Sequence, residues 1–133
     1  MVKTKIKVYG YHLDMYGHVN NARYLEFLET ARWEFIENKM PLSYLDNLGI
    51  AFVVASISIN YRRPAFLGQI LDVRTHMAHI SNKSAKIHQK ILLGGTEKLV
   101  ADADITFVII DAKTQKVIPI TGKIRKIIEL FNT

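Results

Sequence analysis

One segment of this sequence combines helical spacing with almost no polar face. From residue 21 to about residue 39, apolar side chains recur every three or four residues, and Leu25, Trp33 and Ile36 widen the apolar stripe. Pro41 then ends the helical stretch, because the residue before a proline disfavours the helical conformation. A helix that is apolar over most of its circumference is normally surrounded by other structure. We therefore expect one long central helix that the rest of the chain encloses.

The other apolar segments alternate in polarity with the period of two that is typical of strands. They cover residues 5–9, 52–61, 70–80, 85–93 and 99–110. Short turn-type sequences separate the last four segments, which favours antiparallel neighbours. A short helical piece at residues 42–48 and an amphipathic helix after Pro119 complete the pattern. This order predicts an α+β fold, in which an antiparallel sheet of about five strands wraps around the helix, as in the hotdog fold.

The length of the chain suits one domain over residues 1–133, and a hydrophobic content of 49% is enough for a compact core. A curved sheet of this size leaves one exposed edge and one half-covered face. A second copy of the chain would cover both. We therefore expect a homodimer at least, and we expect the dimers to assemble further into a homotetramer.

Charge and cysteine content exclude several classes of function. Without cysteine, the chain has no disulfide, thiolate metal ligand or cysteine nucleophile, which fits the reducing cytoplasm. A net charge of +6 suits an anionic partner, but the basic residues are scattered and no nucleic-acid-binding motif is present. No apolar run is long enough to cross a bilayer, and no signal peptide precedes the first strand. We expect a cytoplasmic protein with no nucleic-acid partner and no stable membrane insertion.

The segment that leads into the long helix carries the candidate chemistry. Asn20 and Asn21 suit the N-cap position, and the helix start presents unpaired N–H groups at the positive end of the dipole. Such an end can hold an oxyanion, and Asp14 just ahead of it can attack a thioester carbonyl or activate water. A thiolate leaves without a strong acid, so neither a metal nor a cofactor is required. The residues alone also allow Asp14 to be a simple turn residue. For His18, also a candidate catalytic residue, they favour a loop-ordering role over catalysis.

This segment resembles the signature of the 4-hydroxybenzoyl-CoA thioesterase-like hotdog family. The match continues through residues 59–65, the pair at 83–84 and the strand at 101–108, so it covers nearly the whole chain. Within the family, the chain is most similar to the bacterial long-chain acyl-CoA thioesterases of fatty-acid degradation. The matching pattern is Asp14-x-x-Gly17-His18-Val19-Asn20-Asn21-x-x-Tyr24-Leu25-x-Phe27.

The resemblance implies an acyl-CoA thioesterase that releases CoA and a free, long-chain fatty acid. It makes Asp14 the general base or nucleophile, gives the Asn21 N–H to the thioester oxygen, and places the substrate across a subunit interface. From the residues alone, the adjacent arginines are equally well a solvated pair at a strand end. The substrate contacts that the resemblance implies are Gly17, Tyr24, Tyr61, Arg62, Arg63, Pro64, Lys83 and Ser84.

Several alternatives stay open at this point. Glu29 is the second candidate base, because another branch of hotdog thioesterases places its carboxylate about two turns into the helix. Acyl-carrier-protein thioesters are an alternative substrate that a basic surface would suit, and a non-catalytic acyl-CoA-binding module is a third interpretation. Asp102 and Asp104 share one face of a strand, where lysine or water would satisfy them. Acyl chain length and the choice between general-base and anhydride routes also stay open.

Overall fold

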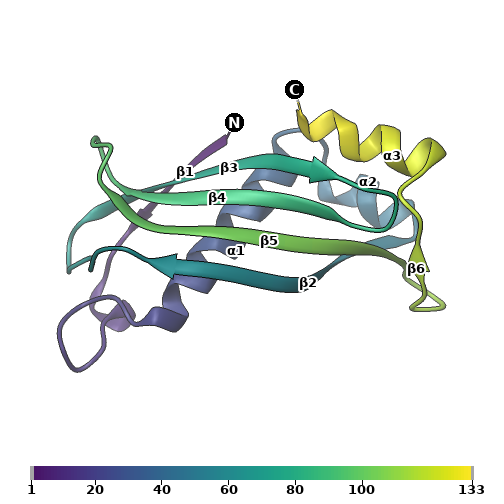
Figure 1. Ribbon diagram of the computed structural model, residues 1–133. Coiled ribbons are helices and arrows are strands. Elements are labelled where there is room, and N and C mark those ends of the chain that lie inside the picture. Colours follow the sequence, from purple (N-terminus) through teal and green to yellow (C-terminus); the bar gives the residue numbers. More distant parts are fainter. Residues whose placement is uncertain (1, 133) are drawn as a thin grey trace.

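The structure, a computed structural model, describes residues 2–132 of the 133-residue chain. Figure 1 shows a curved sheet with one long helix against one face and the C-terminal helix at the far end. In chain order the elements are β1 (Val2–Lys7), a 3-10 turn (Gly10–His12), α1 (Asn21–Glu37), α2 (Leu42–Asn47), β2 (Ile50–Tyr61), β3 (Ile70–Ile80), β4 (Ala85–Leu93), β5 (Leu99–Asp111), β6 (Val117–Ile118), α3 (Gly122–Glu129) and a second 3-10 turn (Leu130–Asn132).

The sheet is antiparallel throughout, and its strands lie in the order β1-β3-β4-β5-β2. Within residues 2–132, five long strands form this path, and the two-residue β6 pairs with β5 beside it. The predicted α+β hotdog arrangement is confirmed. The bounds of the helix and the later strands agree with the sequence pattern to within two residues. In the described residues no helix is long and apolar enough to span a membrane.

The first strand lies earlier in the chain than residues 5–9. β1 runs from Val2 to Lys7, and Val8 lies fully buried just after it. The polar residue Thr4 occupies an inward-facing position, which hid the alternation in the sequence. Thr4 is 2% exposed, and its hydroxyl donates a hydrogen bond of 2.7 Å to Oε2 of Glu34 on α1. At Thr4, the third residue of β1, a buried hydroxyl with a partner thus replaces an apolar side chain.

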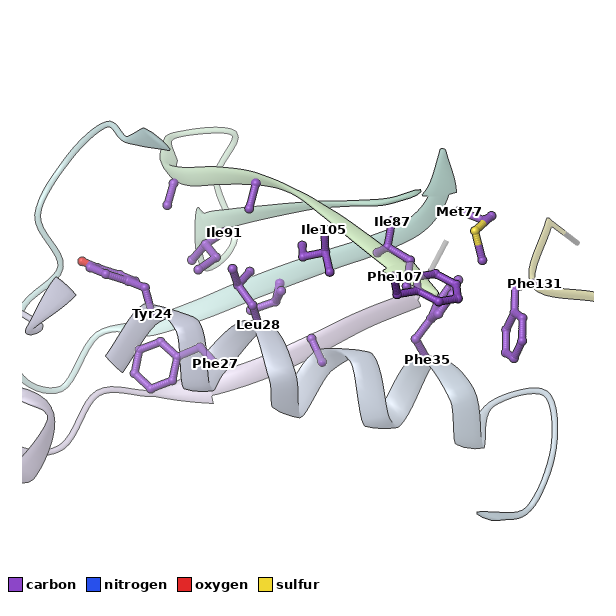
Figure 2. Close-up of a cluster of buried hydrophobic side chains, with 14 of the residues drawn as sticks. Tyr24, Phe27, Leu28, Phe35, Met77, Ile87, Ile91, Ile105, Phe107 and Phe131 are labelled. Carbon is purple, nitrogen blue, oxygen red and sulfur yellow. The ribbon is translucent and has the colours of Figure 1, made fainter. Parts of the chain in front are cut away.

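The core lies between α1 and the concave face of the sheet. One face of the helix contributes Tyr24, Phe27, Leu28, Ala31 and Phe35, all buried. Figure 2 shows Leu28 and Phe35 directed from the helix toward the strands. The opposite side of α1 is not enclosed by this single chain. Its exposed apolar residues are Leu25 and Trp33, and Trp33 is 50% exposed. The prediction of a wrapped helix holds for its sheet-facing side only.

A buried amide fastens α1 to the sheet. Gln89 on β4 is fully buried, and its side-chain nitrogen donates 3.0 Å hydrogen bonds to the Leu28 carbonyl and to the Thr75 hydroxyl. Its side-chain oxygen accepts a 3.2 Å hydrogen bond from Arg32. Because a buried polar group without a partner is costly, these bonds favour one position of the helix on the sheet.

Candidate active site

The start of α1 presents a backbone donor without a partner. Asn20 is the N-cap in an extended conformation, and its side-chain oxygen accepts a 2.9 Å hydrogen bond from the Ala22 N–H. Asn21 is the first helical residue, and within residues 2–132 its N–H makes no hydrogen bond. A free N–H at the positive end of a helix dipole is suited to binding an oxyanion. Of the two predicted cap residues, Asn20 caps the helix and Asn21 offers the donor.

Asp14 lies on a tight turn just before this helix end. The Gly17 N–H closes the turn with a 3.1 Å bond to the Asp14 carbonyl, and Gly17 has a φ of 80° that favours glycine. The Asp14 carboxylate accepts a 2.9 Å hydrogen bond from the Tyr16 N–H through Oδ1. The turn-residue interpretation of Asp14 is therefore correct as far as Oδ1 is concerned. Oδ2 makes no hydrogen bond within the described residues.

Two backbone bonds place this turn against its neighbours. The Asn20 N–H donates to the His12 carbonyl at 2.9 Å, and the Val19 N–H donates to the Ala65 carbonyl at 2.9 Å. His18 contributes its ring, which packs edge-on against Phe66 at 5.6 Å between centroids. The His18 side chain makes no hydrogen bond in residues 2–132. These contacts agree with a role for His18 in ordering the loop.

Two tyrosines meet at the same helix end. The Tyr61 hydroxyl donates a 3.0 Å hydrogen bond to the Asn21 carbonyl, and its ring lies 5.6 Å from that of Tyr24. Burial raises the pKa of Tyr24, a hydrogen bond with the Ala65 backbone opposes the rise, and Tyr61 and the Asp14 carboxylate add to it. The structure thus brings Asp14, Asn21, Tyr24 and Tyr61 into one neighbourhood.

Arg62, which follows Tyr61, pairs with an aspartate of the sheet. Arg62 Nε donates to Asp102 Oδ2 at 2.8 Å, and Asn60 donates to the other oxygen at 3.1 Å. The Arg62 bond is the main reason that the pKa of Asp102 lies below its usual value. Asp102 therefore pairs with arginine, and Asp104 pairs with His88 at 2.8 Å, where lysine or water was expected. His88 comes from the neighbouring strand β4, Arg62 directly follows β2, and both are distant in sequence from the aspartates they pair with.

The pair Lys83 and Ser84 lies far from this neighbourhood in a single chain. Across β5, Tyr61 is opposite Ala101, whereas Ala85, which follows Ser84, is opposite Phe107. Six residues of an extended strand separate these positions by roughly 20 Å. The two candidate substrate contacts, Tyr61 and the turn at 83–84, therefore lie at opposite ends of the sheet.

Glu29 lies at a different place on the helix. It is exposed, eight residues beyond Asn21, which corresponds to about 12 Å along the helix axis. It contributes to the wall of an apolar cavity of about 400 Å³ between α1, α2 and the start of β2. Other residues of the wall are Trp33, Ile36, Leu45, Phe52, Phe107 and Phe131. This wall was not identified from the sequence. The leucines spaced three apart in residues 42–48 are the sequence signal that could have indicated it.

Among the described residues, no group of three or more histidine or carboxylate side chains is arranged to hold a metal ion. The arrangement can polarise a carbonyl oxygen at the Asn21 N–H while a carboxylate stands nearby. Such chemistry is suited to acyl transfer to water.

Comparison with known proteins gives a consistent picture. A model of the thioesterase-like superfamily matches residues 10–128. The long-chain acyl-CoA thioesterase FadM of Escherichia coli is 50% identical over 128 residues, which are 96% of this chain and 97% of that relative. The crystal structure of the YbaW probable thioesterase from Escherichia coli superimposes with a TM-score of 0.93 at 48% identity, covering 100% of both chains. The acyl-CoA thioesterase YbgC of Helicobacter pylori is 34% identical over 89 residues, which are 65% of this chain and 64% of the relative.

Proposed function

Because this chain belongs to the thioesterase-like superfamily, we propose that it hydrolyses long-chain fatty acyl-CoA to a free fatty acid and CoA. The observation that carries the proposal is the free Asn21 N–H at the start of α1, with Asp14 on the turn that precedes it. The name of the FadM relative, which matches nearly the whole chain, supports the substrate class.

In the proposed reaction, the thioester carbonyl oxygen accepts a hydrogen bond from the Asn21 N–H. The dipole of α1 then stabilises the negative charge that develops on this oxygen. In one route, Asp14 takes a proton from water as the water oxygen attacks the carbonyl carbon. In the other, the Asp14 carboxylate attacks first and water hydrolyses the resulting anhydride. In both routes the carbon–sulfur bond breaks and the CoA thiolate leaves, since a thiolate is a good leaving group.

The acyl chain of the substrate is proposed to follow the outer side of α1. Fourteen residues separate Asn21 from Phe35, which gives a path of about 21 Å along the helix. The path ends at the apolar cavity of about 400 Å³, which falls within the range of small-molecule sites. Trp33 and Ile36 form part of the wall at this end. A long apolar chain fits such a wall better than a short polar acyl group.

Gly17, Tyr24, Tyr61, Arg63 and Pro64 are kept as proposed substrate contacts near the thioester. The Arg62 guanidinium already pairs with Asp102, so its proposed contact with the nucleotide uses the nitrogen atoms that this pair leaves over. For Lys83 and Ser84 to contact the same CoA, they must come from a second subunit.

We also propose a homodimer that forms through β2. This strand lies at the edge of the sheet, is twelve residues long, and exposes Val53, Val54 and Ile57. A long apolar edge strand is a surface on which another chain pairs. Light scattering after gel filtration tests the proposal, and a monomer at working concentration contradicts it. A further step to a homotetramer and a cytoplasmic location stay predictions that the same experiment and cell fractionation test.

The first test is thiol release from palmitoyl-, octanoyl- and benzoyl-CoA by the parent protein, Asp14→Asn and Glu29→Gln. An asparagine at position 14 keeps an oxygen that accepts the Tyr16 N–H, so the turn survives while the base is lost. We expect Asp14→Asn to lose activity by about a hundredfold or more, and Glu29→Gln to remain within a few-fold of the parent. Full activity of Asp14→Asn would show that the base lies elsewhere.

Two controls separate the other interpretations. Palmitoyl thioesters of CoA and of acyl carrier protein, compared directly, test whether the net charge of +6 serves a protein carrier. Binding of palmitoyl-CoA without any turnover by the parent protein would identify a non-catalytic module. A single turnover in ¹⁸O-labelled water, followed by mass spectrometry, tests the anhydride route. Attack of water on the Asp14 carbonyl of the anhydride leaves the label in Asp14, whereas the general-base route puts it directly into the fatty acid.

A further inference from the structure

Two tight turns at the α1 end of the molecule carry large apolar side chains at their tips. The turn at 14–17 presents Met15 and Tyr16, which are 89% and 74% exposed. The turn at 66–69 is closed by a 3.1 Å bond from the Gln69 N–H to the Phe66 carbonyl, and Leu67 at its tip is 62% exposed. Turn tips are normally occupied by glycine, proline, asparagine, aspartate or serine. Apolar tips on both turns therefore call for an explanation outside the fold.

The two turns lie side by side. A β-bridge joins His18 to Phe66, and the Val19 N–H bonds the Ala65 carbonyl at 2.9 Å. Figure 1 shows both connecting segments at the end of the molecule away from α3. Exposed tyrosines continue the surface. We call the whole area the turn-tip surface, formed by Tyr9, Tyr11, Met15, Tyr16, Phe66 and Leu67.

Ring contacts order the aromatic side chains of this surface outside the core. The Tyr9 ring stacks on that of Tyr11 at 5.9 Å between centroids, and Tyr16 stacks on His18 at 6.3 Å. A contiguous cluster of exposed apolar side chains of this kind marks an interaction site. Tyrosine has an apolar ring and a polar tip, so it suits a boundary between water and lipid.

Apart from the Asp14 carboxylate, which begins the first turn, the charges beside the turn-tip surface are positive. The Lys7 ammonium lies 5.7 Å from the centre of the Tyr9 ring, and Lys5 is exposed on the same strand. Arg63 is exposed three residues before the second turn. Asp72 is opposite Lys5 in the sheet, and it is the nearest acid on the neighbouring strand. Basic side chains around an apolar tip complement an anionic lipid surface, whereas two copies packed tip to tip would bring like charges together.

We propose that the turn-tip surface docks the protein on an anionic lipid bilayer. Met15 and Leu67 enter the boundary between headgroups and acyl chains, and the tyrosines lie at the headgroups. Asp14 begins the first turn, so docking seats the proposed catalytic carboxylate at the water–lipid boundary. There it meets long-chain acyl thioesters that have partitioned into the bilayer. The substrate part of this inference rests on the proposed function, but the docking part does not.

The test is cosedimentation of the full chain with sucrose-loaded vesicles of phosphatidylcholine, with and without phosphatidylglycerol. We expect the parent protein to sediment with the anionic vesicles, and Met15→Ser or Leu67→Ser to lower its partition by about tenfold each. Lys5→Gln with Lys7→Gln should remove the preference for phosphatidylglycerol. Val117 is an exposed apolar residue on β6, outside the turn-tip surface. Val117→Ser is therefore the matched control and should bind like the parent.

A second readout separates docking from the reaction. Leu67→Ser should slow hydrolysis of palmitoyl-CoA held in vesicles while it leaves hydrolysis of dissolved octanoyl-CoA unchanged. Equal sedimentation of the parent and both tip variants, or no sedimentation of the parent, overturns the inference. Light scattering that shows the tip variants to dissociate an oligomer of the parent also overturns it, because a second copy then covers the surface. A protein that binds vesicles but hydrolyses no thioester refutes the proposed reaction and keeps the docking.

Discussion

The N-cap of α1 allows charge at the proposed oxyanion site to be changed without changing the helix. Asn20 accepts the Ala22 N–H at 2.9 Å. An aspartate at this position is nearly isosteric and accepts the same bond, whereas an alanine removes the acceptor. The two substitutions, Asn20→Asp and Asn20→Ala, should therefore separate stability from activity.

The two substitutions should change Tm in different directions. Loss of an N-cap acceptor costs about 1 kcal/mol, and in a domain of this length that lowers Tm by about 4 °C for Asn20→Ala. Asn20→Asp keeps the cap and adds a favourable interaction with the dipole of about 0.3 to 1 kcal/mol, so its Tm should be unchanged or slightly higher. A negative charge on the order of 8 Å from the developing oxyanion, at an effective dielectric constant of about 20, opposes it by about 2 kcal/mol, which is roughly thirtyfold in rate.

The assay pairs thermal unfolding with kcat/KM for palmitoyl-CoA, at low and at high salt. Asn20→Asp should be the more stable and the less active of the two variants, and salt should restore part of its activity. An Asn20→Asp protein with full activity would refute the argument that the thioester oxygen lies at this helix end. Equal loss of activity in both variants would show that cap geometry, not charge, is what matters.

Three further predictions concern stability. Gly94→Ala should lower Tm markedly, because its Cβ would lie 2.7 Å from a backbone oxygen of β3, whereas Gly10→Ala, with no atom within 4 Å, should change it little; thermal unfolding checks both. Leu28→Ala empties a core position that is 1% exposed and should cost about 2 to 5 kcal/mol in urea unfolding, and a smaller loss would mean that the core collapses around it. The hydrogen bond from Arg62 lowers the pKa of Asp102 from its usual 3.8, so this stabilisation is present above that pH and is lost as the pH falls below it. Arg62→Gln should therefore reduce the fall in the urea midpoint between about pH 5 and about pH 3, and an unchanged profile would contradict the pairing.

The later strands and the long helix were predictable because a single period governs each of them. β3 and β4 alternate regularly, and Pro41 and the asparagine cap delimit α1. β1 was displaced because Thr4 is buried through a hydrogen bond to Glu34, a contact across 30 positions that alternation of polarity does not encode. Local patterns report local structure, and this residue is placed by a distant one.

The candidate site was predictable to the extent that its residues are close in sequence. Asp14 and Asn21 are joined by one turn, so the structure places them as the motif suggests. Tyr61 joins them only through a hydrogen bond to the Asn21 carbonyl that the sheet creates. Lys83 lies at the other end of the sheet because antiparallel strands reverse direction at each turn, and a linear pattern does not report that distance.

Under the proposed function, the buried amide of Gln89 has a consequence for the length of acyl chain that the protein accepts. Its hydrogen bond to the Leu28 carbonyl opposes sliding of α1 along the sheet. The distance along α1 from the Asn21 N–H to the cavity beside Phe35 then stays at about 21 Å. If this distance is fixed, the accepted chain length can change only at the cavity end. Under the proposed function, evolution or design would therefore change chain-length preference through the cavity wall around Trp33 while the catalytic end stays as it is.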